Sequence, residues 1–255
     1  TAKKFGLGEK VLDGMFIEEK VGLVPSTKWK KKYLGRGWVL GETLITGIGQ
    51  GYIQTTPIQL CLMTAQLANG GFKIYPKITL DENEKTLKNI KGEISKKIDE
   101  KKQNQLDIIK TGEKFFKPKQ DEYQPLFRNQ ENIKFVLESM FGATNEVMGT
   151  SYGSRFENPK YQFAGKTGTS QVKRITELQR ELDLKTSEIP YEERDHALYV
   201  AYGPYKNPRY ALSVVVEHGG SGSSTAAPIA KKLFKLIIDR HQLREKTRLG
   251  RFKTA

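Results

Sequence analysis

Two apolar runs toward the carboxyl end constrain the fold of this chain more than any other feature. Residues His196 to Tyr202 and Tyr210 to Val216 are rich in aromatic and branched aliphatic side chains. The connection between them includes, within residues 203–208, a glycine, two prolines and an asparagine. Turn residues between two such runs are typical of a hairpin, so the sequence predicts a pair of antiparallel strands.

Helices are predicted on both sides of this hairpin. Thr56 is a suitable N-cap and Pro57 suits the first helical position, and the apolar spacing that follows ends at Asn69-Gly70-Gly71. Residues Asn132 to Val147 repeat the helical spacing, and Ala226 to His241 form an amphipathic helix whose apolar stripe should pack on the sheet. Helices before and after antiparallel strands indicate an α+β fold, with an antiparallel sheet flanked by helices.

The apolar stripe of the last helix can be assigned to particular residues. They are Ile229, Ala230, Leu233, Leu236 and Ile237.

Three segments show little periodicity. Residues 9–40 contain many glycines and the basic run Lys28 to Lys32, which predicts a long ordered loop. From Lys77 to Gln124 the chain is rich in lysine and poor in apolar residues, which is typical of a solvated excursion between packed elements. The charged segment Ile175 to His196 is expected to contain a short inserted helix.

Composition excludes several kinds of site. The single cysteine, Cys61, excludes an intramolecular disulfide and a thiolate metal site. His196, His218 and His241 lie far apart in the sequence without metal-ligand spacing, so no metal site is predicted. The formal net charge of +14 favours an anionic partner of some kind, without choosing between lipid, acidic polymer and nucleic acid.

The two ends of the sequence carry few signals. No apolar run reaches the roughly 18 residues that cross a bilayer. Residues Thr1 to Gly8 resemble the last turn of a helix, with Gly6 or Gly8 as its stop. Because no methionine opens the chain, we expect further residues to precede it.

The stretch Phe163 to Ser170 has the most chemical character. It places Lys166 and three hydroxyl side chains around Gly168 in a predicted strand, Tyr161 to Val172. Strand alternation puts Lys166 and Gly168 on one face, and Thr167 and Thr169 on the other. Gly168 leaves room for a ligand backbone, so the strand edge is suited to bind a peptide by strand addition, with a cation and hydroxyls beside its carboxylate.

A K-T-G tripeptide alone is a weak signal, but its surroundings form a longer pattern. In chain order the pattern comprises G-I-G-Q-G at 47–51, T-P-I-Q at 56–59, K-T-G-T-S at 166–170, the hairpin, His218-Gly219-Gly220 and the terminal amphipathic helix. This order resembles the class B penicillin-binding proteins, and among them the transpeptidases of cell elongation. The resemblance extends over nearly the whole chain, with residues 1–245 as the C-terminal part of the transpeptidase domain, the excursion at 77–124 within it, and a basic tail at 246–255.

The resemblance implies a serine acyl-transferase that cross-links peptidoglycan stem peptides through an acyl-enzyme. It assigns catalytic roles to Lys166, which lends positive charge, and to Thr169, which binds the substrate carboxylate and gives one N–H to the oxyanion hole. Thr167, Gly168, Thr169 and Ser170 form the substrate-binding stretch.

The same family uses two further motifs, S-x-x-K with the nucleophile and S-x-N. The sequence has one S-x-x-K spelling, Ser170 to Lys173, but in a strand these two positions lie on opposite faces, whereas the motif needs one face of a helix start. No Ser-x-Asn occurs, and Tyr205-Lys206-Asn207 is better explained as turn residues. We therefore expect no nucleophile in this chain, an inactive chain on its own, and a nucleophile in residues before Thr1.

Further expectations follow from the resemblance alone. The ligands would be D-Ala-D-Ala stem peptides and β-lactams, with no cofactor, no metal and no nucleic acid. The partners would be the elongation glycosyltransferase and scaffold proteins, at the periplasmic face of the bacterial inner membrane through an N-terminal anchor.

Two alternatives remain open. The first is a related D,D-carboxypeptidase or serine β-lactamase, whose K-T-G strand would look alike. The G-I-G-Q-G to T-P-I-Q block favours the transpeptidase class over it. The second is a basic, non-enzymatic module that binds nucleic acid or a surface.

Overall fold

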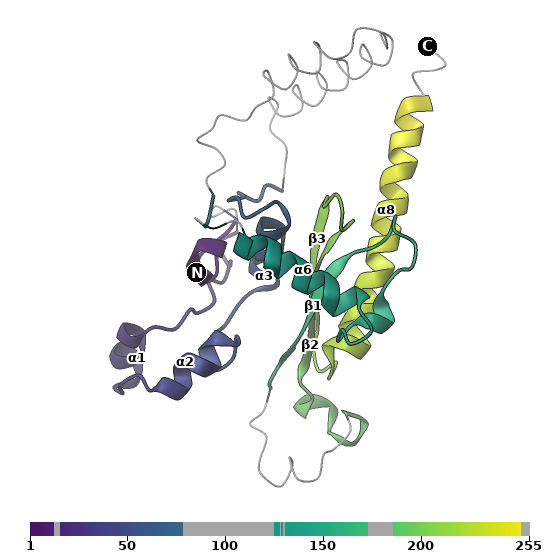
Figure 1. The fold of residues 1–255 in the computed structure, drawn as a ribbon. Coiled ribbons are helices and arrows are strands. Elements are labelled where there is room, and N and C mark those ends of the chain that lie inside the picture. Colours follow the sequence, from purple (N-terminus) through teal and green to yellow (C-terminus); the bar gives the residue numbers. More distant parts are fainter. Residues whose placement is uncertain (13–15, 79–124, 128, 130, 173–185, 251–255) are drawn as a thin grey trace.

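The computed structural model describes most of the chain, in several ranges (Figure 1). These are residues 1–12, 16–78, 125–127, 129, 131–172 and 186–250, with side chains up to residue 244. The predicted excursion at 77–124 therefore lies almost entirely outside the described residues, as does the second half of the predicted tail. A single turn of 3-10 helix, Ala2–Phe5, opens the chain and ends at Gly6 with a φ of 90°, as the sequence predicts.

Within the described ranges, three antiparallel strands form the central sheet. They are β1 (Ala164–Ser170), β2 (His196–Gly203) and β3 (Tyr210–Val216), in the order β1-β2-β3. In the register, Gly165 lies opposite Ala201, and Ala201 lies opposite Leu212. The predicted hairpin is confirmed as β2 and β3, and β1 forms one edge of this sheet.

One face of the sheet packs against the last helix, α8 (Ala227–Gly250). Its buried side chains are Ala227, Ala230, Phe234 and Ile238. The predicted stripe was therefore partly wrong, because Ile229 and Leu233 are each 38% exposed and Leu236 is 66% exposed. The buried positions recur every three or four residues, one residue away from the prediction, and the two alanines let the helix approach the sheet closely. The helix also continues nine residues beyond His241, the predicted end.

The opposite face is covered by α3 (Pro57–Ala68) and α6 (Glu131–Asn145), which share an apolar core with Tyr202 of β2. Both helices are predicted from the sequence and confirmed. Thr56 caps α3 through its hydroxyl, which accepts a hydrogen bond from Gln59 N at 3.3 Å, while Thr56 N donates to Gln59 Oε1 at 3.0 Å. This reciprocal cap satisfies two donors that the helix start would otherwise leave unpaired.

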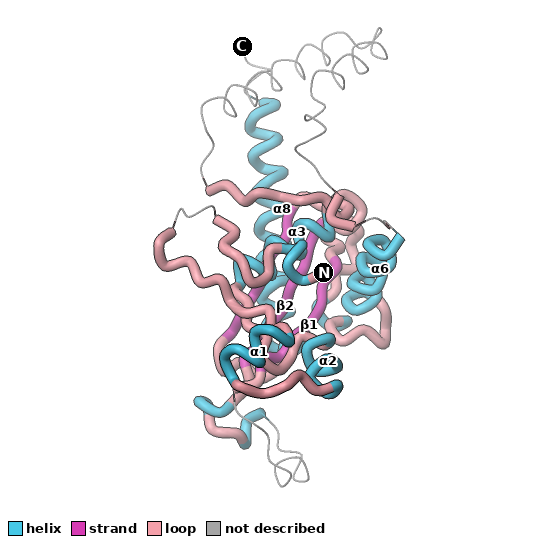
Figure 2. Tube along the Cα trace, turned by 90° about the vertical axis from the view of Figure 1, so that its left-hand side faces the viewer, coloured by secondary structure: helices cyan, strands magenta, loops and turns pink. Residues whose placement is uncertain are grey.

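Residues 9–40 were predicted as a loop, and this prediction was wrong for part of the segment. The structure places α1 at Thr27–Leu34 and begins α2 (Leu40–Gly47) at residue 40, and both helices project away from the sheet (Figures 1 and 2). Ser26 Oγ accepts a hydrogen bond from Trp29 N at 3.1 Å, and Gly35 ends α1 with a φ of 64°. The sequence shows little sign of this short helix, because only Trp29 and Tyr33 mark its apolar side within the run of lysines.

A buried ion pair joins α1 to α2. Lys30 Nζ lies 2.5 Å from Glu42 Oε1 and donates a hydrogen bond to Gly37 O at 2.7 Å, while the other oxygen of Glu42 accepts from Val39 N. The side chains of Lys30 and Glu42 are only 7% and 16% exposed. The hydrogen bond from Lys30 holds the pKa of Glu42 below its ordinary value.

This ion pair predicts an acid-sensitive opening of the α1–α2 segment. Because the folded pKa of Glu42 is depressed, its stabilising effect is complete above the unfolded value of about 4.3 and is lost as the pH falls through the lower folded value. Both tryptophans of the chain, Trp29 and Trp38, lie on this segment. Tryptophan fluorescence should therefore change below about pH 4.3.

Glu42→Gln is expected to shift this fluorescence at neutral pH and to abolish the acid transition. Glu138→Gln, which removes an exposed carboxylate of α6, serves as the control and should leave the transition unchanged. An unaltered transition in Glu42→Gln would show that another group controls the segment.

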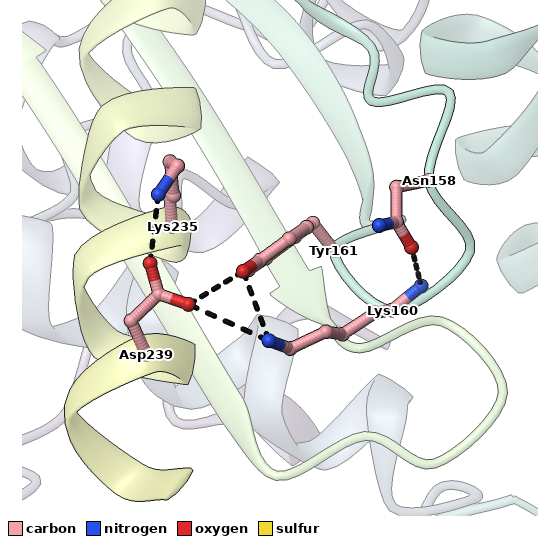
Figure 3. Close-up of polar contacts among 5 residues, drawn as sticks. All are labelled: Asn158, Lys160, Tyr161, Lys235 and Asp239. Atoms are coloured by element: carbon pink, nitrogen blue, oxygen red, sulfur yellow. Dashed lines mark hydrogen bonds and ion pairs between the residues drawn. The ribbon is translucent and has the colours of Figure 1, made fainter. Parts of the chain in front are cut away.

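A polar cluster fixes α8 to the chain just before β1 (Figure 3). Tyr161 donates a hydrogen bond to Asp239 Oδ1 at 2.6 Å, Lys235 Nζ lies 2.8 Å from Asp239 Oδ2, and Lys160 Nζ lies 2.9 Å from the Tyr161 hydroxyl. The bond from Lys235, followed by that from Tyr161, lowers the pKa of Asp239. The residues that lead into β1 are thereby held against the terminal helix.

The segment before β2 contains short helical turns. Between residues 186 and 195 the chain forms two single turns of 3-10 helix, Thr186–Glu188 and Tyr191–Glu193, whereas the first part of the segment predicted to hold an inserted helix is outside the described residues. Across the ranges that are described, no helix has the length and apolar character needed to cross a membrane.

Candidate active site

Strand β1 carries the K-T-G stretch along the edge of the sheet. The Lys166, Thr169 and Ser170 side chains are exposed, whereas Thr167 and Gly168 are half-buried. Lys166 Nζ donates a hydrogen bond to Thr167 O at 2.9 Å. A primary ammonium therefore lies beside the backbone of the strand, where it can meet an anionic group.

The register confirms the predicted alternation of side chains along β1. Lys166 and Gly168 lie opposite Val200 and Leu198, on the face that α3 and α6 partly cover. Thr167 and Thr169 lie opposite Tyr199 and Ala197, on the face of α8.

The outer edge of β1 is capped at one end, and at the other end no strand of the described residues pairs with it. Thr144 Oγ1 accepts a hydrogen bond from Gly165 N at 3.0 Å, and Asn145 Nδ2 donates to Phe163 O at 3.0 Å, so the end of α6 takes the place of a neighbouring strand. Backbone groups alternate in direction along an antiparallel strand. Because the N–H of Gly165 points outward, those of Thr167 and Thr169 point outward too, and they can pair with an added peptide strand.

A cavity of about 520 Å³ opens beside this edge. It is lined by α6 between Phe135 and Ala143, by residues 146 and 148–150 and by Lys166, and the carboxylates of Glu138 and Glu146 belong to this lining. Thr150 Oγ1 lies 3.1 Å from Thr167 Oγ1 and joins the wall of the cavity to the strand. The size is that of a small-molecule or peptide side-chain site.

Two histidines meet at the far end of β1. His196 lies opposite Ser170, its Nδ1 accepts a hydrogen bond from His218 N at 2.9 Å, and the two ring centroids are 4.8 Å apart. The sequence did not predict this contact, because the two histidines are 22 residues apart. His218 has a positive φ of 55° where it meets His196. Among the residues that the structure describes, no three histidine, cysteine or carboxylate side chains are placed to hold a metal ion.

The two short sequences that imitate family motifs, Ser170 to Lys173 and Tyr205 to Asn207, lie in other surroundings. Ser170 is the last residue of β1 and is not at a helix start, and Lys173 is outside the described residues. Tyr205 lies in the β2–β3 connection, where its ring packs 4.1 Å from that of Phe141 and its N–H bonds Gln162 O at 2.8 Å. A packed turn explains this triplet without a catalytic role.

Family comparison agrees with this geometry. Residues 1–235 match the model described as penicillin binding protein transpeptidase domain. The chain therefore belongs to the penicillin-binding protein transpeptidase family, as its motif order predicts.

The relatives within this family are peptidoglycan D,D-transpeptidases. MrdA of Salmonella typhimurium strain SL1344 is 33% identical over 237 residues, which is 92% of this chain and 33% of the relative. MrdA of Haemophilus influenzae is 31% identical over 244 residues, which is 93% of this chain and 32% of the relative. The chain thus spans about a third of the length of the curated relatives it matches.

Solved structures give the same result. The penicillin-binding protein PBP2 of Helicobacter pylori, in complex with MreC, superposes with a TM-score of 0.66 at 26% identity, over 93% of this chain and 34% of that one. PBP2 of Pseudomonas aeruginosa, in complex with WCK 5153, superposes with a TM-score of 0.63 at 33% identity, over 92% and 42%. The predicted α+β fold with a helix-flanked antiparallel sheet is confirmed.

Proposed function

We propose that this chain supplies the K-T-G wall of a peptidoglycan D,D-transpeptidase that cross-links stem peptides during cell elongation. The observation that carries the proposal is the edge of β1, where the Lys166 ammonium lies beside a strand whose Thr167 and Thr169 backbone groups point outward. A stem peptide that ends in D-Ala-D-Ala has the two features this edge suits, an extended backbone and a terminal carboxylate.

The residues of the strand have distinct roles in this proposal. Lys166 provides positive charge toward the reacting centre, and the Thr169 hydroxyl binds the substrate carboxylate while its N–H donates to the oxyanion of the tetrahedral intermediate. Thr167, Gly168 and Ser170 shape the strand that holds the peptide. The acyl group passes from the penultimate D-alanine to a serine, with release of the terminal D-alanine, and then to an amine of a second stem peptide.

The serine itself is proposed to belong to a segment that these 255 residues do not include. Neither Ser170 nor any other serine of the sequence begins an S-x-x-K run at a helix start. The chain then acts as one side of a site that is completed by the remainder of its transpeptidase domain. A β-lactam would bind there as an analogue of D-Ala-D-Ala.

Covalent labelling with a fluorescent penicillin tests this proposal. A protein that joins these residues to the S-x-x-K serine should form a stable fluorescent adduct, and an excess of unlabelled penicillin should prevent it. The 255-residue chain alone should form none, because it lacks the nucleophile. An adduct on the chain alone, or no adduct on the longer protein, would contradict the proposal.

The proposal extends to the binding partners of the protein and to its location in the cell. The solved complex of a related PBP2 with MreC supports a scaffold protein of the elongation machinery as a partner of this protein. The elongation glycosyltransferase is proposed as a further partner on the family resemblance alone. Peptidoglycan stem peptides lie outside the inner membrane, so we place the site at its periplasmic face, with the protein held there by an N-terminal anchor. Depletion of the protein should therefore turn rod-shaped cells round.

A further inference from the structure

Three hydroxyl side chains meet behind the K-T-G strand, and the family motifs do not include them. They are Thr144 of α6, Ser151 of the loop after it and Tyr199 of β2, and we refer to them as the hydroxyl cluster. Thr144 and Tyr199 have no exposed surface, and Ser151 is 2% exposed. Three buried hydroxyls from separate elements need mutual hydrogen bonds to offset their desolvation.

The cluster is fully hydrogen-bonded. The Tyr199 hydroxyl lies 2.9 Å from Thr144 Oγ1 and 3.0 Å from Ser151 Oγ, and Ser151 Oγ lies 3.0 Å from Ala143 O. Gly165 N donates to Thr144 Oγ1 at 3.0 Å. These contacts allow one continuous chain of donors: Gly165 N–H to Thr144, Thr144 to Tyr199, Tyr199 to Ser151, and Ser151 to the Ala143 carbonyl. Bonds in such a chain polarise and strengthen one another.

Tyr199 reaches this place by crossing β1. It lies opposite Thr167 in the register, and its ring extends diagonally over Gly165 toward the outer edge of the strand. A Cβ atom at Gly165 would lie only 2.5 Å from Tyr199 Cζ. Gly165 therefore leaves the space through which the tyrosine passes, and its N–H is the group that the cluster binds.

The cluster acts at the residue that precedes Lys166. It binds Gly165 to the end of α6, and Thr150, next to Ser151, approaches Thr167 on the other side of Lys166. Lys166 is thus flanked by two fixed points, although among the described residues its own ammonium bonds only the neighbouring Thr167. The burial of Tyr199 raises the pKa of its hydroxyl, which keeps it a neutral donor.

We infer that Tyr199, Thr144 and Ser151 are positioning residues for acylation, which hold the edge of β1 so that Lys166 and Thr169 face the reacting serine. This inference rests on the proposed function. None of the three touches the substrate, so they act through the backbone at Gly165. Small displacements of catalytic groups are costly, about a hundredfold in rate for 1 Å.

Tyr199→Phe tests the inference, and Tyr202→Phe is its matched control. Tyr202 is a tyrosine of the same strand, 1% exposed, whose hydroxyl also bonds α6, at Leu137 O, but on the opposite face, whereas the Gly165 N–H bonds Thr144. In the protein that carries the serine, Tyr199→Phe should lower the first-order acylation rate about tenfold or more, with little change in non-covalent affinity for the penicillin. Tyr202→Phe should leave the rate unchanged, although it too loses a buried hydroxyl.

Thr144 gives a second pair of variants. Thr144→Val, which removes the acceptor of Gly165 N–H, should slow acylation as Tyr199→Phe does, and Thr144→Ser, which keeps it, should restore a rate close to that of the wild type. All rates are compared at a temperature where every variant is folded. Equal rates in Tyr199→Phe and the wild type, or an equal loss in Tyr202→Phe, would overturn the inference.

Amide hydrogen exchange of the 255-residue chain separates this inference from the proposed function, because it needs no acylation. The Gly165 amide should exchange faster in Tyr199→Phe and Thr144→Val than in the wild type, and at the wild-type rate in Tyr202→Phe. An unchanged exchange rate of the Gly165 amide in these variants would show that the hydroxyl cluster does not hold Gly165, and would overturn the inference. Absence of penicillin labelling in the wild-type protein would instead count against the proposed function.

Discussion

Gly165→Ala is expected to lower the free energy of unfolding by about 3 kcal/mol, because overpacking a rigid interior costs this much. The new methyl group would overlap the Tyr199 hydroxyl and lie 2.7 Å from its Cε1. Tyr199 cannot move aside easily, since it is fully buried, packs edge-on against Phe163 and would lose its hydrogen bonds to Thr144 and Ser151. Urea unfolding followed by circular dichroism measures the effect.

Gly168→Ala is the matched control on the same strand. A Cβ at Gly168 points to the other face and meets only Leu198 Cβ, at 3.4 Å, an ordinary contact. Its free energy of unfolding should stay within about 1 kcal/mol of the wild type. Equal losses in the two variants would mean that the crossing of Tyr199 over Gly165 does not limit the packing of β1.

Lys166→Ala is expected to reduce the rate of acylation by a penicillin about a hundredfold or more in the protein that carries the serine. The lysine is exposed and, within the part of the chain that the structure describes, its hydrogen bonds go to its own strand, so its removal should change the free energy of unfolding little. Loss of a preorganised cation beside the developing negative charge should instead raise the activation barrier. Rapid-mixing measurements of fluorescent penicillin binding give the rate.

Lys134→Ala provides the control for this variant. Lys134 lies on α6, its side chain is 77% exposed, and its removal changes the net charge by the same amount. The acylation rate of Lys134→Ala should match the wild type. A Lys166→Ala protein that acylates normally would exclude Lys166 from the chemistry.

The parts of the fold that could be predicted from the sequence are those with a strong local signal. The hairpin has turn residues between two apolar runs, and α3 has a cap, a proline and a glycine stop within fifteen residues. Helix α1 was missed because it is short and only Trp29 and Tyr33 mark its apolar side within a run of lysines. A serine cap and a lysine paired with Glu42 of the next helix stabilise it. The predicted apolar stripe of α8 was partly wrong by one residue, because the helix packs on the sheet through Ala227, Ala230, Phe234 and Ile238.

The candidate site was predictable only in part for a similar reason. The K-T-G stretch is contiguous, so its alternation on the strand could be derived from its spacing alone. The hydroxyl cluster joins residues that are 48 and 55 positions apart, and a threonine inside a helix gives no signal that its hydroxyl will bind a strand. The contact between His196 and His218 is likewise created by the hairpin and by a positive φ.

The central claim is that these residues form the K-T-G wall of a penicillin-binding site and contribute no nucleophile. Mass-spectrometric mapping of the penicilloyl adduct, in the protein that joins this chain to the S-x-x-K serine, tests it most directly. The account predicts one acylated serine, in an S-x-x-K sequence outside these 255 residues, and slower formation of that adduct in Lys166→Ala. An adduct on Ser170, or on any other serine of this chain, would contradict it.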